Sequence, residues 1–216
     1  MTTRGRLALL AACGVVAALV ALYTAATAPA PTPGAPPGSV RLGPEPGEAV
    51  AAYLARAAAT LPPPGTTALA LVQFAEERTV ADTPATGTPV EAVFRVDLPR
   101  VQTALRFVPL EPGSPTALDT ARLQAANAAS ADAGRLTGRP AAVATAEAAA
   151  LTRPECSCVV AMVATADGAA LRRPGAGVRV IEAAPQGVTL RELALSPLLP
   201  EQADRADPLP DDGPVP

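Results

Sequence analysis

The longest apolar stretch of the chain covers residues 7–28 and carries no charge. As a helix it would span about 33 Å, which matches the roughly 30 Å hydrocarbon core of a bilayer. Arg4 and Arg6 precede the stretch and the next charged residue is Arg41, so the positive-inside rule places the N-terminus in the cytoplasm. The pattern predicts a cytoplasmic stub (residues 1–6) followed by a transmembrane helix that acts as an uncleaved signal anchor.

Two alternatives also direct the chain to a membrane but predict a different mature protein. In the first, a signal peptidase removes the segment: Ala26 and Ala28 have suitably small side chains, but Pro29 disfavours a cut after Ala28. A cut after Ala26, with Thr24 at the −3 position, is the alternative site. In the second, the run Leu-Ala-Ala-Cys that ends at Cys13 resembles the motif of lipidated bacterial proteins, although the chain stays apolar beyond it. The uncleaved anchor makes the membrane lipid bilayer a partner of the chain.

Two segments differ in composition from the rest of the chain. Residues 29–46 are rich in Pro and Gly, which favours extended, partly stiff conformations and predicts a stalk. Residues 201–216 are acidic and Pro-rich, which predicts a disordered tail. Between them, residues 47–200 are long enough for one modest domain with its own core. The signal anchor places this domain outside the cytoplasm.

The hydrophobic pattern of this domain predicts both helices and strands. Apolar residues recur at three- and four-residue steps over residues 48–61, and Pro62 ends this predicted helix. Residues 76–89 are turn-rich. Alternating or continuous apolar runs predict strands at residues 66–74, 90–96, 101–110, 156–165 and 178–183.

Alanine-rich segments predict further helices. One covers residues 118–133, with Ser114 as its N-cap, Pro115 at its first position and Gly134 at its end. The remaining helical segments are predicted at residues 140–151 and 168–173.

An internal repeat relates the two halves of the domain. The strands at 66–74 and 90–96 match those at 156–165 and 178–183, and each pair is followed by Pro, Thr, Arg and a Pro-Leu step. Two strand–helix–strand units predict an α+β fold, a duplicated ferredoxin-like sandwich whose sheet is covered by helices on one face.

Composition excludes several classes of chemistry. The chain contains no His and no Lys, which rules out Ser-His-Asp and Cys-His catalysis, His-ligated metals and Schiff-base chemistry. Its net charge of −3 argues against nucleic acid as a partner. Glu76, Glu77 and the aspartates of the tail are interpreted as solvated groups. We therefore predict no catalytic residue, no cofactor and no metal site, and a protein that is not an enzyme.

Cys156 and Cys158 are the one pair of reactive side chains close in sequence. In an extended strand they point to the same face with Cα atoms roughly 6.5 Å apart, near the limit of disulfide geometry. The oxidising compartment outside the membrane favours pairing. Three interpretations compete: a local disulfide or buried thiols, a disulfide to another chain, and a redox-active or metal-binding dithiol. A position at the mouth of a pocket would favour the last, and burial would disfavour it.

The segment from Cys156 to Pro216 is rich in Ala and Pro and ends in an acidic run. It resembles uncharacterised single-pass membrane proteins of actinobacteria, and the resemblance implies a location but no activity. We therefore expect an extracytoplasmic interaction or binding domain in the cell envelope, with an unidentified envelope protein as its partner. The alternatives are a thiol-based redox or other small envelope enzyme, and a structural accessory subunit of a membrane complex.

Overall fold

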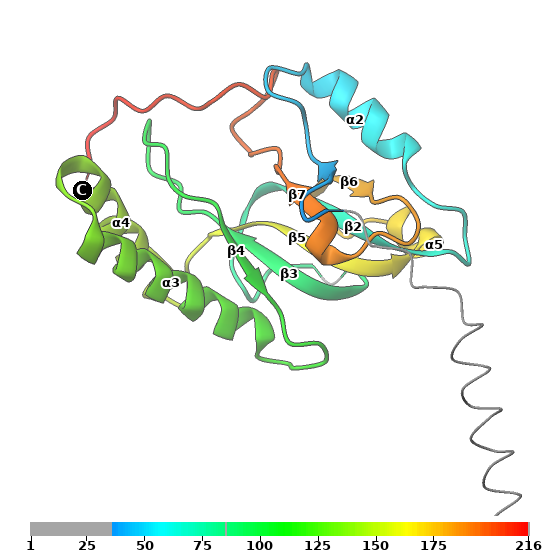
Figure 1. Ribbon diagram of the computed structural model, residues 1–216, viewed down its shortest axis with the longest axis horizontal. Helices are drawn as coiled ribbons and strands as arrows, with labels where there is room; N and C mark the ends of the chain where they lie inside the picture. The colour runs from blue at the N-terminus through cyan, green and yellow to red at the C-terminus, as the bar shows by residue number, and fades with distance from the viewer. Residues whose placement is uncertain (1–35, 85, 216) are drawn as a thin grey trace, which may run out of the picture. The chain divides into compact units, whose positions relative to one another are not determined.

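The computed structural model describes residues 36–84 and 86–215, so the predicted membrane helix at residues 7–28 lies outside the described residues. The described chain combines helices with a mostly antiparallel five-stranded sheet (Figure 1), which confirms the predicted α+β class. Within those two ranges, no helix has the length and apolar character needed to cross a membrane.

The main sheet has the strand order β4-β3-β5-β2-β6, and each neighbouring pair is antiparallel. Its strands are β2 (Thr67–Arg78), β3 (Thr88–Phe94), β4 (Arg106–Pro109), β5 (Val159–Asp167) and β6 (Val178–Ala183). All five correspond to strands predicted from the sequence, although β4 is much shorter than predicted because only its last part pairs with β3.

A second sheet pairs β1 (Val40–Leu42) with β7 (Leu193–Leu195) in parallel. The sequence did not predict these strands because three residues are too few to show an alternating pattern. β1 falls within the segment predicted as a stalk, yet Leu42 is buried in a core cluster with residues of the main sheet. The folded unit therefore begins ahead of residue 47, at residue 36.

The bounds of β2 and β5 also differ from the prediction. β2 continues through Glu76 and Glu77 to Arg78, where the turn-rich segment was expected to begin, because Arg78 pairs with Val159 of β5. β5 begins at Val159 rather than at Cys156. The residues before it form a turn, in which the backbone N–H of Cys156 donates to the carbonyl of Arg153 at 3.1 Å.

Four α-helices among the described residues follow the predicted positions with shifted ends: α2 (Val50–Ala59), α3 (Ala117–Arg135), α4 (Gly138–Thr152) and α5 (Gly168–Leu171). A 3₁₀ turn, η1 (Leu190–Glu192), was not predicted. The predicted start of α3 was wrong: the helix begins after Thr116, whose side chain makes no capping bond. The carbonyl of Ser114 instead accepts a hydrogen bond from the N–H of Ala117 at 3.2 Å, which closes a turn ahead of the helix.

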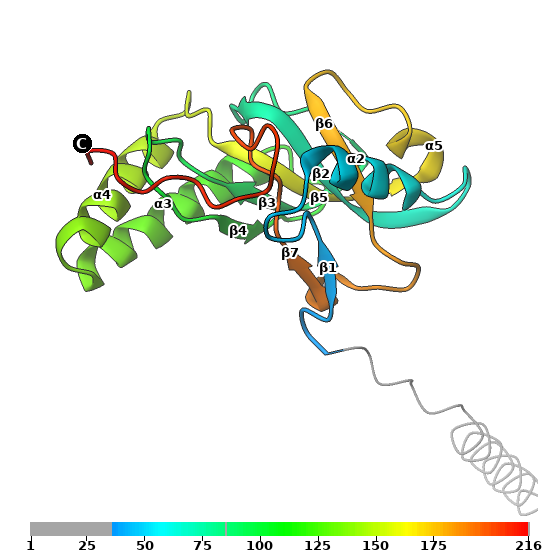
Figure 2. The same cartoon turned by 90° about the horizontal axis from the view of Figure 1, so that it is seen from above.

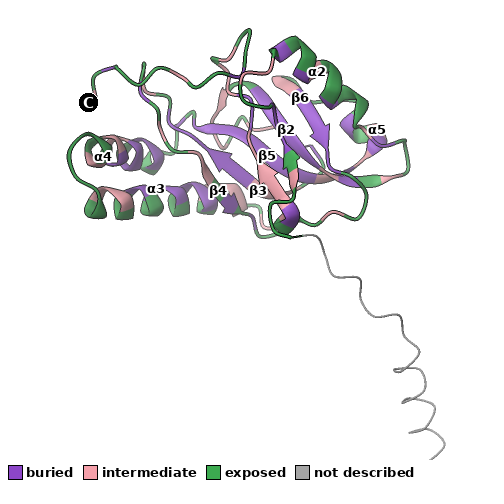
Figure 3. Ribbon diagram, turned by 45° about the horizontal axis from the view of Figure 1, so that its top comes forward, coloured by how far each residue is buried: buried purple, intermediate pink, exposed green. Residues whose placement is uncertain are grey.

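The two faces of the main sheet are covered by different elements (Figures 1 and 3). Along β2, Val72 and Phe74 pack into the core shared with α3 and α4, whereas Leu71 faces the β1–β7 sheet. α2 lies against β6, where Tyr53 packs with Val180. The central strands β2 and β5 are thus buried on both faces over most of their length, as the purple ribbon of Figure 3 shows.

A buried polar network links α2 and β1 to the main sheet. The carboxylate of Glu182 on β6 accepts hydrogen bonds from the Tyr53 hydroxyl at 3.0 Å, the Arg56 guanidinium at 2.8 Å and the Gly43 N–H at 2.6 Å. Gln73 on β2 donates to the Tyr53 hydroxyl. Because these buried groups have partners, the network avoids the cost of unpaired polar atoms and fixes how the layers meet.

Residues 201–215 lie along the domain and run towards α4 (Figure 2), which differs from the disordered tail expected from composition. Arg139 pairs with Asp211 at 3.0 Å, and Arg100 forms an ion pair with Asp212. An acidic segment can be ordered when positively charged side chains pair with it. Here Arg100 and Arg139, from two distant segments of the chain, supply those side chains.

Candidate functional site

Cys156 and Cys158, the candidate disulfide of the sequence analysis, are joined by a disulfide just before β5, with Cα atoms 5.4 Å apart. They are closer than the roughly 6.5 Å expected for an extended strand, and they lie between the turn at residues 154–155 and the start of β5. Cys156 is 8% exposed and Cys158 is fully buried, and both belong to the core cluster shared with α3 and α4. A redox-active dithiol must be reached by its substrate, so this burial disfavours the redox alternative.

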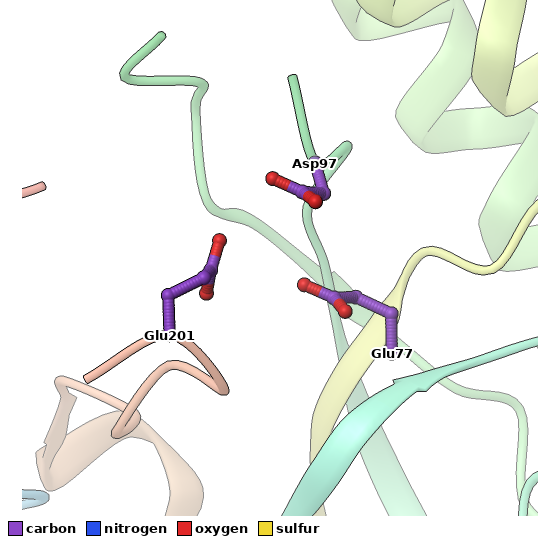
Figure 4. A group of neighbouring side chains, drawn as sticks. All are labelled: Glu77, Asp97 and Glu201. Atoms are coloured by element: carbon purple, nitrogen blue, oxygen red, sulfur yellow. The ribbon is translucent and has the colours of Figure 1, made fainter. Parts of the chain in front are cut away.

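An acidic cluster forms where three distant segments meet (Figure 4). It consists of Glu77 at the end of β2, Asp97 after β3 and Glu201 near the start of the C-terminal segment, with carboxylate oxygens within 4.8 Å of one another. The guanidinium of Arg95, 2% exposed, lies among them. It is 2.7 Å from Glu201, 3.2 Å from Glu77 and 3.5 Å from Asp97.

The electrostatics of this cluster are dominated by burial and by like charges. Burial raises the pKa of Glu77 above its ordinary value, the neighbouring Glu201 and Asp97 raise it further, and Arg95 opposes them. The pKa of Asp97 is raised by burial and then by Glu201. Three carboxylates are an oxygen-rich set of the kind that holds hard cations. Arg95 already supplies the positive charge at their centre, so the arrangement serves as an ion cluster that ties the C-terminal segment to the sheet.

The sequence pattern did not predict this cluster, and the prediction for one of its members was wrong. Glu77 was interpreted as a solvated group, yet it is half-buried and paired with Arg95. Asp97 and Glu201 lie far apart in the sequence, and no local pattern relates them. The one signal available was Arg95 itself, a lone charge inside the apolar run of the strand predicted at residues 90–96.

A shallow groove of about 580 Å³ runs beside β4, on the sheet face that carries β1 and β7. This β4 groove is lined by Glu91, Phe107, Pro109, Leu190, Leu193 and Leu195. Phe107 is 40% exposed, and the three leucines are half-buried. The groove therefore presents apolar surface to solvent on one side of the domain.

Two charges lie in this otherwise apolar groove. Arg191 is exposed at its rim. Glu91 is half-buried, and burial alone raises the pKa of its carboxyl group. Among the residues that the structure describes, the Glu91 carboxylate makes no ion pair and accepts no hydrogen bond. It is thus partly removed from water without a compensating partner, which is energetically unfavourable for an ionised group.

A smaller cavity of about 210 Å³ lies between α3, α4 and the segment that leads into β4. The arginines that line it already form ion pairs with carboxylates of the same domain. Arg106 pairs with Asp132 at 3.0 Å and donates from Nε to Glu147 at 3.2 Å, and Arg139 pairs with Asp211. The cavity therefore offers a ligand fewer free charges than the β4 groove does.

Comparison of the chain with protein-family models, with curated proteins and with solved structures finds no match.

Proposed function

We propose that this protein is a membrane-anchored binding protein of the cell envelope, whose α+β domain holds a protein partner in the β4 groove. The observation that carries the proposal is the groove itself, where half-buried leucines and Phe107 lie around the Glu91 carboxylate. Within residues 36–84 and 86–215 this carboxylate has no ion-pair or hydrogen-bond partner. Apolar surface gathered in a concave site marks an interaction surface more strongly than scattered exposed residues do.

The other sites support a binding role less well. The carboxylates of the acidic cluster are engaged by Arg95, and the cysteines are buried in the core. In the β4 groove, by contrast, a partner would cover exposed apolar surface and supply the charge that Glu91 lacks. Both changes favour association.

The finer assignment, a duplicated ferredoxin-like sandwich, is part of the same proposal. It is supported by the strand order β3-β5-β2-β6, in which β2 and β3 run parallel with β5 between them. A helix, α5, links β5 to β6. The corresponding link between β2 and β3 is a loop over its described residues, 79–84 and 86–87, so the first unit would have lost its helix.

The groove is tested by selecting peptides from a displayed random library on the full chain in lipid nanodiscs. We expect selected peptides to bind at least about tenfold more weakly to Phe107→Asp, because the new charge enters the apolar wall and must be desolvated. Leu123→Asp is the matched control, since Leu123 on α3 is 42% exposed and Phe107 is 40% exposed. Equal binding to the two variants, or a library that yields no binder, would refute the proposed site.

The anchor is tested separately with a reporter enzyme that is active only outside the cytoplasm, fused after Pro216. We expect high reporter activity in the membrane fraction. Reversing the flanking charges with Arg4→Glu and Arg6→Glu should lower this activity several-fold, because those arginines set the orientation. Deleting residues 1–28 should move the fusion to the soluble fraction. An inactive fusion that stays in the membrane fraction would contradict the proposed orientation.

A further inference from the structure

The outer edge of β4 has no partner strand among the described residues. β4 is the last strand of the main sheet, and the N–H of Leu110 donates to the carbonyl of Val90 on β3 at 2.9 Å. Backbone groups alternate in direction along an antiparallel strand, so those of Phe107 and Pro109 point away from β3. A proline at this position is typical of an edge strand, because it has no N–H to offer a neighbour. An incoming strand can therefore pair with the N–H of Phe107 and with both carbonyls.

The same alternation governs the side chains. Val108 packs into the core shared with α3 and α4, whereas Phe107 and Pro109 line the β4 groove. A strand that pairs with β4 would turn every second side chain towards this groove. Those side chains would meet Leu193 and Leu195 on its opposite wall.

Glu91 sets the charge that such a segment should carry. It lies on β3 directly across from Pro109. Since adjacent strands are about 4.8 Å apart, a strand added to β4 would run roughly 10 Å from the backbone of Glu91. A long cationic side chain on the added strand, lying over Pro109, and the Glu91 side chain together span this gap. A short or apolar side chain would leave the carboxylate covered and unpaired, which is costly.

We propose that the β4 groove binds an extended polypeptide segment that adds to β4 as a strand and places an Arg or Lys side chain beside Glu91. This inference rests on the proposed function and specifies the chemistry of the partner. Backbone hydrogen bonds to the edge supply part of the affinity, and the alternate side chains supply the specificity, as in other cases of strand addition.

The test uses the full chain in nanodiscs and a capped, fluorescent peptide of sequence Thr-Val-Thr-Arg-Thr-Val-Thr, with binding followed by fluorescence anisotropy. A second peptide has norleucine in place of Arg. The edge is probed with Phe107→Pro and Phe107→Val. Both variants lack the aromatic ring, but only the proline also removes the outward N–H, so their difference isolates strand pairing. The charge is probed with Glu91→Gln, which keeps the side-chain shape.

We expect Phe107→Pro to bind the Arg peptide about tenfold more weakly than Phe107→Val, which corresponds to the loss of about one interfacial hydrogen bond. Glu91→Gln should weaken binding of the Arg peptide about tenfold and that of the norleucine peptide less than twofold. Equal binding by the two Phe107 variants would overturn strand addition. An equal response of the two peptides to Glu91→Gln would overturn the charge requirement. If wild-type chain binds library-selected peptides but not the Arg peptide at millimolar concentration, this inference fails while the proposed function stands.

Discussion

Replacing Arg95 with Met is expected to lower the free energy of unfolding by about 3–5 kcal/mol at pH 7, the usual cost of removing one partner from a buried ion pair. The Arg95 side chain is 2% exposed and contacts all three carboxylates of the acidic cluster. Methionine fills a similar volume but leaves like charges facing one another. Asp97 and Glu201 are partly exposed, so water screens part of the repulsion and the low end of the range is expected.

The loss should disappear as the pH falls. The folded-state pKa values of Glu77 and Asp97 already lie above the ordinary values of 4.5 and 3.8, and removing Arg95 raises them further because Arg95 lowers both. An acid with a raised folded pKa binds more protons when folded, so its contribution to stability is complete below the ordinary pKa and is lost as the pH rises through the folded pKa. The gap between variant and wild type should therefore close towards pH 4.

Urea unfolding followed by circular dichroism between pH 4 and pH 8 measures this gap directly. Arg100→Met is the matched control, because the Arg100–Asp212 pair is exposed on both sides, at 62% and 64%. Exposed pairs of this kind contribute little to stability because solvent screens them. A gap for Arg95→Met that stays constant across this pH range would show that the cluster does not carry the destabilisation.

Replacing Glu182 with Ala is expected to cost about 3 kcal/mol or more of stability at neutral pH. Its carboxylate accepts hydrogen bonds from Tyr53, Arg56 and the Gly43 N–H. The Tyr53 hydroxyl and the Gly43 N–H would be left buried without this partner, at about 1–3 kcal/mol for each unsatisfied group. Arg56 loses less, because it is 43% exposed and keeps its ion pair with Glu48 at 3.0 Å.

Thermal and urea unfolding of three variants separate these contributions. Glu182→Gln keeps an acceptor oxygen and should cost less than Glu182→Ala. Glu45→Ala is the control, since Glu45 is 64% exposed and lies 3.8 Å from Arg41. It should change stability by no more than about 0.5 kcal/mol. If Glu182→Ala were as mild as Glu45→Ala, the network would not hold α2 and β1 to the sheet.

Most of the fold class followed from local pattern. The alternation at residues 90–96 and the apolar run at residues 156–165 predicted β3 and β5, and Pro62 correctly bounded the first helix. These predictions succeeded because an element buried on one side repeats its own geometry along the sequence, whereas a strand buried on both sides, such as β5, is a continuous apolar run. Element ends were less accurate. β2 reached Arg78 through pairing with β5, which the sequence near Glu76 does not encode.

The sequence by itself determined the class of fold, the chemistry that the absence of His and Lys excludes, and the pair of cysteines near the start of β5. Only the tertiary structure decided which charged side chains are buried and which residues they pair with. Glu182 accepts a hydrogen bond from Gly43 across 139 residues of sequence, and Arg95 forms ion pairs with Glu77 and Glu201. Glu91 lies beside β4 with no partner in the part of the chain that the structure describes. A charged side chain has the same local pattern whether it lies in solvent or inside the domain. Its role is fixed only when distant segments fold against it and remove water.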